Sequence, residues 1–142
     1  MRASPLVGRL EKIVGASRVQ ARGLERALFA KDAGMVRGAS PDAVVFPESL
    51  AEVVSIVAAA RESGAALVTR GTGTGVAGGA VPAGGVVLVT TRLNRILEVD
   101  PVARTAWVVL GVLTLDLSRH TAPWGLHFAP DPSSQAACTI GG

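Results

Sequence analysis

The sequence is poor in cysteine, lysine and aromatic residues. Cys138 is the single cysteine among 142 residues, which excludes an internal disulfide framework or a metal site of several cysteines and fits a reducing compartment. Only two lysines accompany twelve scattered arginines, and tyrosine is absent. A nucleic-acid surface needs clustered basic residues with aromatic stacking partners, so we expect no nucleic-acid partner despite the net charge of +3.

Long hydrophobic runs and a leader segment are also missing. The apolar stretches at 53–60 and 86–89 are too short or too interrupted to span a bilayer, and residues 1–15 lack the apolar core of a secretory signal. The chain is nevertheless 49% hydrophobic and only 18% charged, a balance that excludes ordinary disorder. We therefore expect one cytoplasmic domain with a substantial core.

A helical lead-in is expected over residues 1–40. Apolar residues between 6 and 14 recur at helical spacing, Gly15 stands where that helix would end, and a weaker pattern continues at 24–28. Glycine and proline interrupt residues 31–41, which predicts a loop before the next regular element.

A strand–helix–strand unit is predicted between residues 43 and 70. The apolar run at 43–46 indicates the first strand, and the run at 65–70 indicates the second. A unit of about 30 residues of this kind favours parallel strands joined by a right-handed crossover.

The helix of this unit is marked at both ends and along one face. Ser49 and Glu52 have the spacing of a capping box, and Gly64 stands where a left-handed C-terminal cap is expected. Apolar residues repeat at helical spacing, which predicts a buried stripe. These residues are Leu50, Val53, Val54 and Val57.

The second half of the chain is expected to turn toward antiparallel pairing, which makes the fold class α+β. The expected elements are strands at 86–90, 96–100 and 105–110, a helix at 113–120 ended by Pro123 and Gly125, and the start of a strand at 138–140. A turn at Asp100–Pro101 would join the second and third of these strands.

A glycine-rich loop separates the two halves. Seven of the nine residues from Gly71 to Gly79 are Gly or Thr. Glycines permit positive φ and let consecutive N–H groups converge on an anion, while Thr72 and Thr74 add hydroxyl donors. A pyrophosphate is the expected ligand, and the alternative is a glycine-rich connection bent for packing alone.

Two common phosphate-binding motifs do not fit this loop. The spacing Gly73-x-Gly75-x-x-Gly78 matches the dinucleotide fingerprint, but glycines and a proline after it disfavour the required helix, and the expected acidic residue does not follow. A Walker loop needs a lysine after its last glycine, and no lysine follows Lys31. The loop is therefore expected to lead directly into a strand.

Other residues with reactive side chains give weaker indications. Arg70 ends a predicted strand beside the loop, where it either neutralises phosphate charge or forms a surface ion pair. Asp131 lies between prolines and is either a structural turn residue or a cofactor contact. His120 and His127 lack neighbouring ligands at metal spacing, and Cys138 lacks a His–Asx partnership, so we expect no metal and no catalytic residue in this chain.

Several segments, in order and correctly spaced, resemble a known family. They are P-D-A-V-V-F-P-E-S at 41–49, V-T-R-G-T-G-T-G-V-A-G-G at 68–79, V-L-V-T-T-R-L-N-R-I-L-E-V-D at 87–100 and A-P-D-P-S-S-Q-A-A-C-T-I-G-G at 129–142. Together they resemble the N-terminal part of an FAD-binding domain of the vanillyl-alcohol-oxidase/p-cresol-methylhydroxylase (PCMH) type. Within that group they most resemble the glycolate oxidase flavin subunit and related D-lactate dehydrogenases.

The resemblance implies FAD as the cofactor. The glycine loop would wrap the pyrophosphate, and the segment 129–142 would run beside the flavin and ribityl chain. Some members attach FAD covalently through a histidine where this chain has Thr74, so noncovalent FAD is expected. With Arg70 included, the expected cofactor-binding residues are Gly71, Thr72, Gly73, Thr74, Gly75, Gly78, Gly79, Pro130, Asp131, Ser134, Cys138, Thr139 and Gly142.

The resemblance also implies an oxidoreductase that oxidises a small 2-hydroxy acid, such as glycolate or D-lactate, by hydride transfer to FAD. The family pattern continues past the equivalent of Gly142, so residues 41–142 would be a truncated FAD-binding domain. The catalytic base and the substrate site would then lie outside it, and the expected partners would include other subunits of an oxidase complex.

We expect the 142 residues alone to bind FAD weakly or not at all, and to expose a strand edge that invites aggregation. The alternative is an FAD-binding module without activity of its own, which needs a partner chain or is a nonfunctional remnant.

Overall fold

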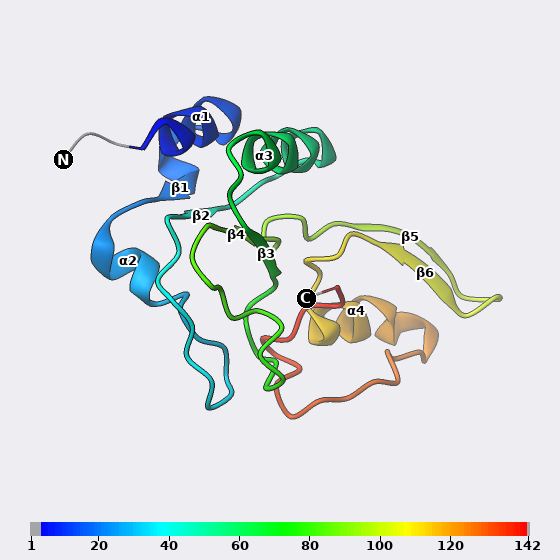
Figure 1. The fold of residues 1–142 in the computed structure, drawn as a ribbon. Coiled ribbons are helices and arrows are strands. Elements are labelled where there is room, and N and C mark those ends of the chain that lie inside the picture. Colours follow the sequence, from blue (N-terminus) through cyan, green and yellow to red (C-terminus); the bar gives the residue numbers. More distant parts are fainter. Residues whose placement is uncertain (1–3, 142) are drawn as a thin grey trace.

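The computed structural model describes residues 4–141, whose arrangement is shown in Figure 1. The helices are α1 (Pro5–Val14), α2 (Gly23–Ala27), α3 (Leu50–Glu62) and α4 (Thr114–Thr121), with short 3-10 turns η1 (Ala16–Arg18) and η2 (Ala122–Trp124). The strands are β1 (Val19–Gln20), β2 (Ala43–Val45), β3 (Leu67–Arg70), β4 (Val86–Val89), β5 (Ile96–Asp100) and β6 (Thr105–Val108).

Four strands form the main sheet in the order β1-β2-β4-β3, and β5 pairs with β6 in a separate hairpin. β2 and β3 both run parallel to β4, which lies between them, as the strand–helix–strand pattern predicts. β1 pairs antiparallel with β2 and was not expected, because two residues are too few to show a strand periodicity. Figure 1 shows α1 and α3 side by side on one side of this sheet, with the hairpin projecting away from it.

The central strands β2 and β4 form the core. Val44, Val45, Val86 and Val87 are completely buried, as expected for parallel strands covered on both faces. The face toward α1 and α3 includes Val45 and Val86, whereas the opposite face includes Val44 and Val87 and is covered by two phenylalanines. The apolar runs that predicted these strands therefore reflect burial on two sides.

The α1 helix begins and ends at the residues that sequence rules favour. Pro5 occupies its first turn, where a missing N–H costs nothing. Gly15 follows its last residue with φ of +88° and donates its N–H to the carbonyl of Glu11. Leu10, on the inner face of α1, is fully buried. The predicted stop at Gly15 is confirmed.

The capping box of α3 forms with one change of partner. The Ser49 hydroxyl accepts the N–H of Glu52 at 3.2 Å, as predicted. The Glu52 carboxylate, however, accepts the N–H of Glu48 at 2.7 Å, one residue before the N-cap. It also binds Arg18 through both oxygens. Gly64 has the expected left-handed conformation after the helix, with φ of +63°.

The buried stripe predicted for α3 is wrong. Leu50, Val54 and Val57 are exposed, at 77%, 61% and 44%, and Val53 is half-buried. The buried residues are Ile56, Ala59 and Ala60, and their face points into the core beneath α1. Nine of the thirteen residues of this helix are apolar and lie on several sides of it, so the periodicity could not decide between faces.

The hairpin and α4 follow the predicted order. Asp100 caps the β5–β6 turn by accepting the N–H groups of Val102 and Ala103, both at 2.9 Å. β5 and β6 pair antiparallel as expected. The strand start expected at 138–140 is reduced to one isolated bridge between Leu113 and Thr139. Within residues 4–141, no helix is long and apolar enough to cross a membrane.

Candidate cofactor site

The glycine loop connects β3 directly to β4 without a helix. Gly73 and Gly78 have φ of +83° and +82°, a region that other residues rarely adopt. Residues 71–85 contain no helix; their regular structure is limited to turns, bends and one isolated bridge from Ala83 to Ala39. This conformation excludes the dinucleotide-binding reading of Gly73-x-Gly75-x-x-Gly78, since that motif requires a helix to begin in the loop.

The loop presents unpaired backbone N–H groups. Between Thr72 and Ala77, no N–H donates to an acceptor within residues 4–141, although several loop carbonyls accept. Consecutive N–H groups of this kind, unshielded by Cβ atoms, are what an anion-binding loop offers. The Gly75 position has no heavy atom near its missing Cβ, so the backbone can be approached closely there.

Arg70 lies beneath the loop and is 8% exposed. Its guanidinium donates to the Lys31 carbonyl at 2.6 Å, makes a longer 3.5 Å contact to the Thr72 carbonyl and lies 5.4 Å from the Phe29 ring centroid. Burial lowers the pKa of Arg70, and the nearby negative charge of Asp32 opposes that shift. The surface ion-pair alternative is therefore wrong, because the side chain is buried and no carboxylate of the described residues lies within salt-bridge distance.

Asp32 is a residue of this site that the sequence analysis missed. Its carboxylate is 7% exposed and accepts the N–H of Gly78 at 3.0 Å and that of Gly34 at 2.8 Å. The pair Asp32 and Gly34 has the spacing of an Asx turn, which a sequence can suggest. Its partner Gly78 is distant in the chain, and no local pattern predicts that contact.

The segment 129–141 meets the glycine loop through Thr72. The Thr72 hydroxyl donates to the carbonyl of Ala137 at 2.6 Å. The first residue of α4, Thr114, holds the same segment through two hydrogen bonds. Its N–H donates to the backbone carbonyl of Cys138 and its hydroxyl to that of Gln135, both at 3.0 Å. Two of the sequence segments that resemble the FAD family are thus brought together by the fold.

The buried hydroxyl of Thr139 is suited to pair with a polar group of a bound ligand. It is 4% exposed, and its hydroxyl oxygen has no hydrogen-bond partner among the described residues. Buried hydroxyls are normally paired. A bound polar group would satisfy this one, and the open N–H groups of the loop suit a pyrophosphate. The residues present therefore fit the two polar parts of FAD.

The remaining candidates lie at the edges of this arrangement. Pro130 and Asp131 are exposed, and neither hydrogen-bonds to the loop within residues 4–141. Ser134 is half-buried and accepts the N–H groups of Ala137 and Cys138 through its carbonyl, both at 2.7 Å. Gly142 lies outside the described residues.

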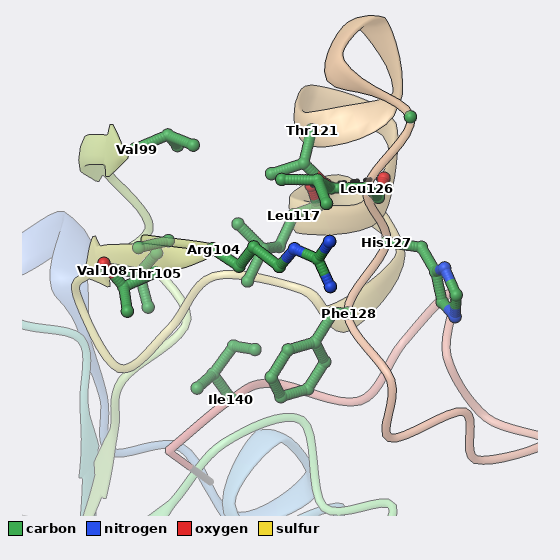
Figure 2. Close-up of a pocket in the computed structure, with 12 residues that line it drawn as sticks. Val99, Arg104, Thr105, Val108, Leu117, Thr121, Leu126, His127, Phe128 and Ile140 are labelled. Atoms are coloured by element: carbon green, nitrogen blue, oxygen red, sulfur yellow. Dashed lines mark hydrogen bonds between the residues drawn. The ribbon is translucent and has the colours of Figure 1, made fainter. Parts of the chain in front are cut away.

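Two cavities occur elsewhere in the structure. One of about 580 Å³ lies between the hairpin and α4; Figure 2 shows Arg104, His127 and Phe128 among its lining residues. The other, of about 740 Å³, lies beside α3 and is lined in part by Leu50, Val53 and Val57. Neither is lined by a predicted cofactor residue. Within the described part of the chain, no cluster of His, Cys, Asp or Glu could hold a metal ion.

Comparison with curated proteins gives close relatives over most of the chain. The chain is 48% identical over 103 residues to glycolate oxidase subunit GlcD of Escherichia coli K12, covering 72% of this chain and 21% of that protein. GlcD of Bacillus subtilis 168 is 41% identical, over 82% of this chain and 25% of that protein. D-2-hydroxyglutarate dehydrogenase of E. coli K12 is 40% identical, over 72% of this chain and 10% of that protein. The chain thus spans a quarter or less of these relatives.

Solved structures share the fold. An alkyldihydroxyacetonephosphate synthase superposes with a TM-score of 0.84 at 23% identity, covering 99% of this chain and 31% of that one. A p-cresol methylhydroxylase superposes with a TM-score of 0.75 at 23% identity, covering 85% of this chain and 24% of that one. The PCMH-type fold and the FAD cofactor expected from the sequence are confirmed. The protein-family model described as "FAD binding domain" matches residues 41–142, and the chain therefore belongs to this FAD-binding family.

Proposed function

We propose that this chain is the cofactor-binding part of a cytoplasmic, FAD-dependent oxidoreductase whose substrate is a small 2-hydroxy acid such as glycolate or D-lactate. The names of the relatives support the reaction class, since glycolate and 2-hydroxyglutarate are both 2-hydroxy acids. The observation that carries the proposal is the bond from the Thr72 hydroxyl to the Ala137 carbonyl. It joins the loop suited to a pyrophosphate with the segment that resembles the family's flavin-side segment.

The chain's own residues bind and orient the cofactor in this proposal. The N–H groups of residues 72–77 bind the pyrophosphate, helped by the hydroxyl of Thr74, and Thr139 donates to a polar group of the flavin half. Arg70, beneath the loop, stabilises the negative charge of the pyrophosphate. Bound FAD supplies the redox chemistry by accepting a hydride from the hydroxyl-bearing carbon of the substrate. The base that takes the hydroxyl proton is not among these residues.

A second candidate function is an FAD-binding module without activity of its own. The 142 residues match 21% of GlcD, so the substrate-binding part of such an enzyme would have to come from other residues, in the same polypeptide or in another. Such a module would bind FAD only with a second polypeptide, such as another subunit of an oxidase. Sequencing the gene beyond the Gly142 codon separates the two candidates. An open frame that encodes more FAD-binding domain favours the enzyme, and a stop codon favours the module or a nonfunctional remnant.

The enzyme proposal is tested on the protein purified as the cell makes it. We expect an oxidised-flavin spectrum, and we expect acid precipitation to release all the flavin, since Thr74 offers no imidazole for a covalent link. Anaerobic addition of glycolate or D-lactate should bleach that spectrum, whereas L-lactate serves as the stereochemical control. Bound flavin that no 2-hydroxy acid reduces would refute the substrate class, and failure to take up FAD would refute the whole proposal.

A further inference from the structure

Asp32 and Arg70 are the two charged residues with buried side chains within residues 4–141. Both lie directly against the glycine loop, although neither belongs to it. A buried carboxylate is costly unless it is hydrogen-bonded and its charge is balanced. The position of this pair beneath an anion-binding loop therefore requires a physical reason.

The hydrogen bonds of Asp32 show what the carboxylate does. Both oxygens are used, one on the N–H of Gly78 and one on that of Gly34. Gly78 has a positive φ, so the carboxylate stabilises a backbone conformation that is not the usual one. The next residue, Ala33, donates its N–H to the carbonyls of Gly73 and Gly75 at 3.0 and 3.1 Å.

Close packing reinforces these contacts. A side chain at Gly34 would overlap the carbonyl of Val76 and the Asp32 carboxylate, so the backbone of residues 32–34 lies flat against the loop. A side chain at Gly73 would overlap the Arg70 guanidinium. Residues 32–34 and Arg70 therefore support the loop from beneath at positions 73, 75, 76 and 78.

We propose that Asp32 is a positioning residue for cofactor binding. Its carboxylate, with Arg70 as the nearby positive charge, holds the second half of the glycine loop in the conformation that binds the FAD pyrophosphate. The N–H of Gly78 is used by Asp32, so it belongs to the support of the site, and the N–H groups of residues 72–77 are left for the phosphates. This inference rests on the proposed binding of FAD to this loop.

Two physical effects of Asp32 on FAD binding have opposite signs, which makes the inference testable. As a negative charge beside a pyrophosphate site, Asp32 repels the ligand, and its neutralisation would tighten binding. As a support that fixes the loop in advance, it lowers the ordering cost of binding, and its loss would weaken binding. Asp32→Asn removes the charge and keeps one acceptor oxygen, so the direction of its effect identifies the dominant role.

The experiment uses the ¹⁵N-labelled protein as the cell makes it, stripped of flavin, and its Asp32→Asn, Asp32→Ala and Asp116→Asn variants. Asp116 is an exposed residue of α4 and provides the matched control. Amide hydrogen exchange at Gly78 is measured without ligand. FAD is then titrated to millimolar concentration while the amide signals of residues 71–79 are followed, a method that detects weak binding.

We expect exchange at Gly78 to be about tenfold faster, and the Kd for FAD about tenfold higher, in Asp32→Ala than in the wild type and in Asp116→Asn. Asp32→Asn should lie between them and carries the test if the alanine variant does not fold. Unchanged exchange at Gly78, or an equal or lower Kd in Asp32→Asn, would overturn the positioning role and leave FAD binding intact. If FAD shifts no loop signal even in the wild type, the proposed FAD binding itself fails, and the positioning role fails with it.

Discussion

The hydroxyl of Thr72 donates a 2.6 Å hydrogen bond to the backbone carbonyl of Ala137, across 65 residues of sequence. This bond fixes the glycine loop against the segment that carries Thr139. Backbone carbonyls do not depend on residue type, so the contact requires a hydroxyl at position 72 and only the path of the chain at position 137. The geometry of the candidate site depends on it.

Replacement of this hydroxyl should separate the two halves of the site. We expect Thr72→Val to lower the free energy of unfolding by about 1 kcal/mol, the net value of one hydrogen bond. We expect the accompanying loss of binding free energy for FAD to be larger than this loss of stability. Chemical denaturation and flavin fluorescence quenching measure the two effects. Thr69→Val is the control, because Thr69 is exposed in β3 and the substituted valine keeps the β-branched shape. Equal effects of the two variants would contradict a special role for Thr72.

Two glycines of the loop should respond differently to alanine. At Gly73 the positive φ alone costs about 1–2 kcal/mol in a residue with a Cβ, and the Arg70 guanidinium must also move. At Gly75 the φ is ordinary and the space is open. We therefore expect Gly73→Ala to destabilise the fold in urea unfolding and Gly75→Ala to leave stability nearly unchanged. Both should weaken FAD binding, Gly75→Ala because its methyl group occupies open space beside the loop backbone and Gly73→Ala because it changes the loop conformation. A stable Gly73→Ala variant would count against the described loop conformation.

Acid should remove the stabilisation that comes from Glu52. The hydrogen bonds from Arg18 are the main cause that lowers the pKa of Glu52 below its usual 4.5. A carboxyl whose pKa is lower in the folded state stabilises the fold above its unfolded pKa, and this contribution is lost as the pH falls through the folded pKa. We expect Glu52→Gln to be less stable than the wild type at pH 7, and the difference to shrink below about pH 4.5.

Denaturant unfolding at several pH values measures this difference. Glu62→Gln is the matched control, because Glu62 pairs with Arg9 on the surface with side-chain exposures of 60% and 45%. Such a pair contributes little in water, so its removal should have a small effect at every pH. A Glu52→Gln deficit that persists unchanged into acid would argue against the Arg18 pairing as its cause.

The hairpin should make this chain prone to association. Leu97 in β5 and Trp107 in β6 are 56% and 72% exposed. Within residues 4–141 the sheet they form contains only these two strands, which leaves each with a free edge. Exposed apolar edges pair with other chains, and a charge on them prevents this. We expect Trp107→Lys to reduce light scattering of concentrated protein. Trp124→Lys, which changes an exposed tryptophan of η2 that is not part of the hairpin, should not; equal effects would locate the association elsewhere.

Local chemistry determined much of this protein from the sequence alone. Gly15 and Gly64 end helices because their positive φ suits glycine, and Ser49 begins α3 because its hydroxyl accepts a free N–H. The valine runs of β2 and β4 predicted buried parallel strands. Prolines and glycines after the loop correctly excluded a helix there, and the loop composition indicated an anion.

Tertiary structure decided the features that depend on contacts between distant residues. The buried face of α3 could not be predicted because the helix is apolar on several sides, and packing near α1 selected Ile56 and the alanines. Arg70 could be a surface or a buried residue until residues 29–33 were placed over it. Asp32 had no recognisable partner in the sequence, since the N–H of Gly78 becomes available to it only when the loop folds back over residues 32–34. Backbone groups that accept or donate across such distances leave no trace in residue type, and only the folded chain reveals them.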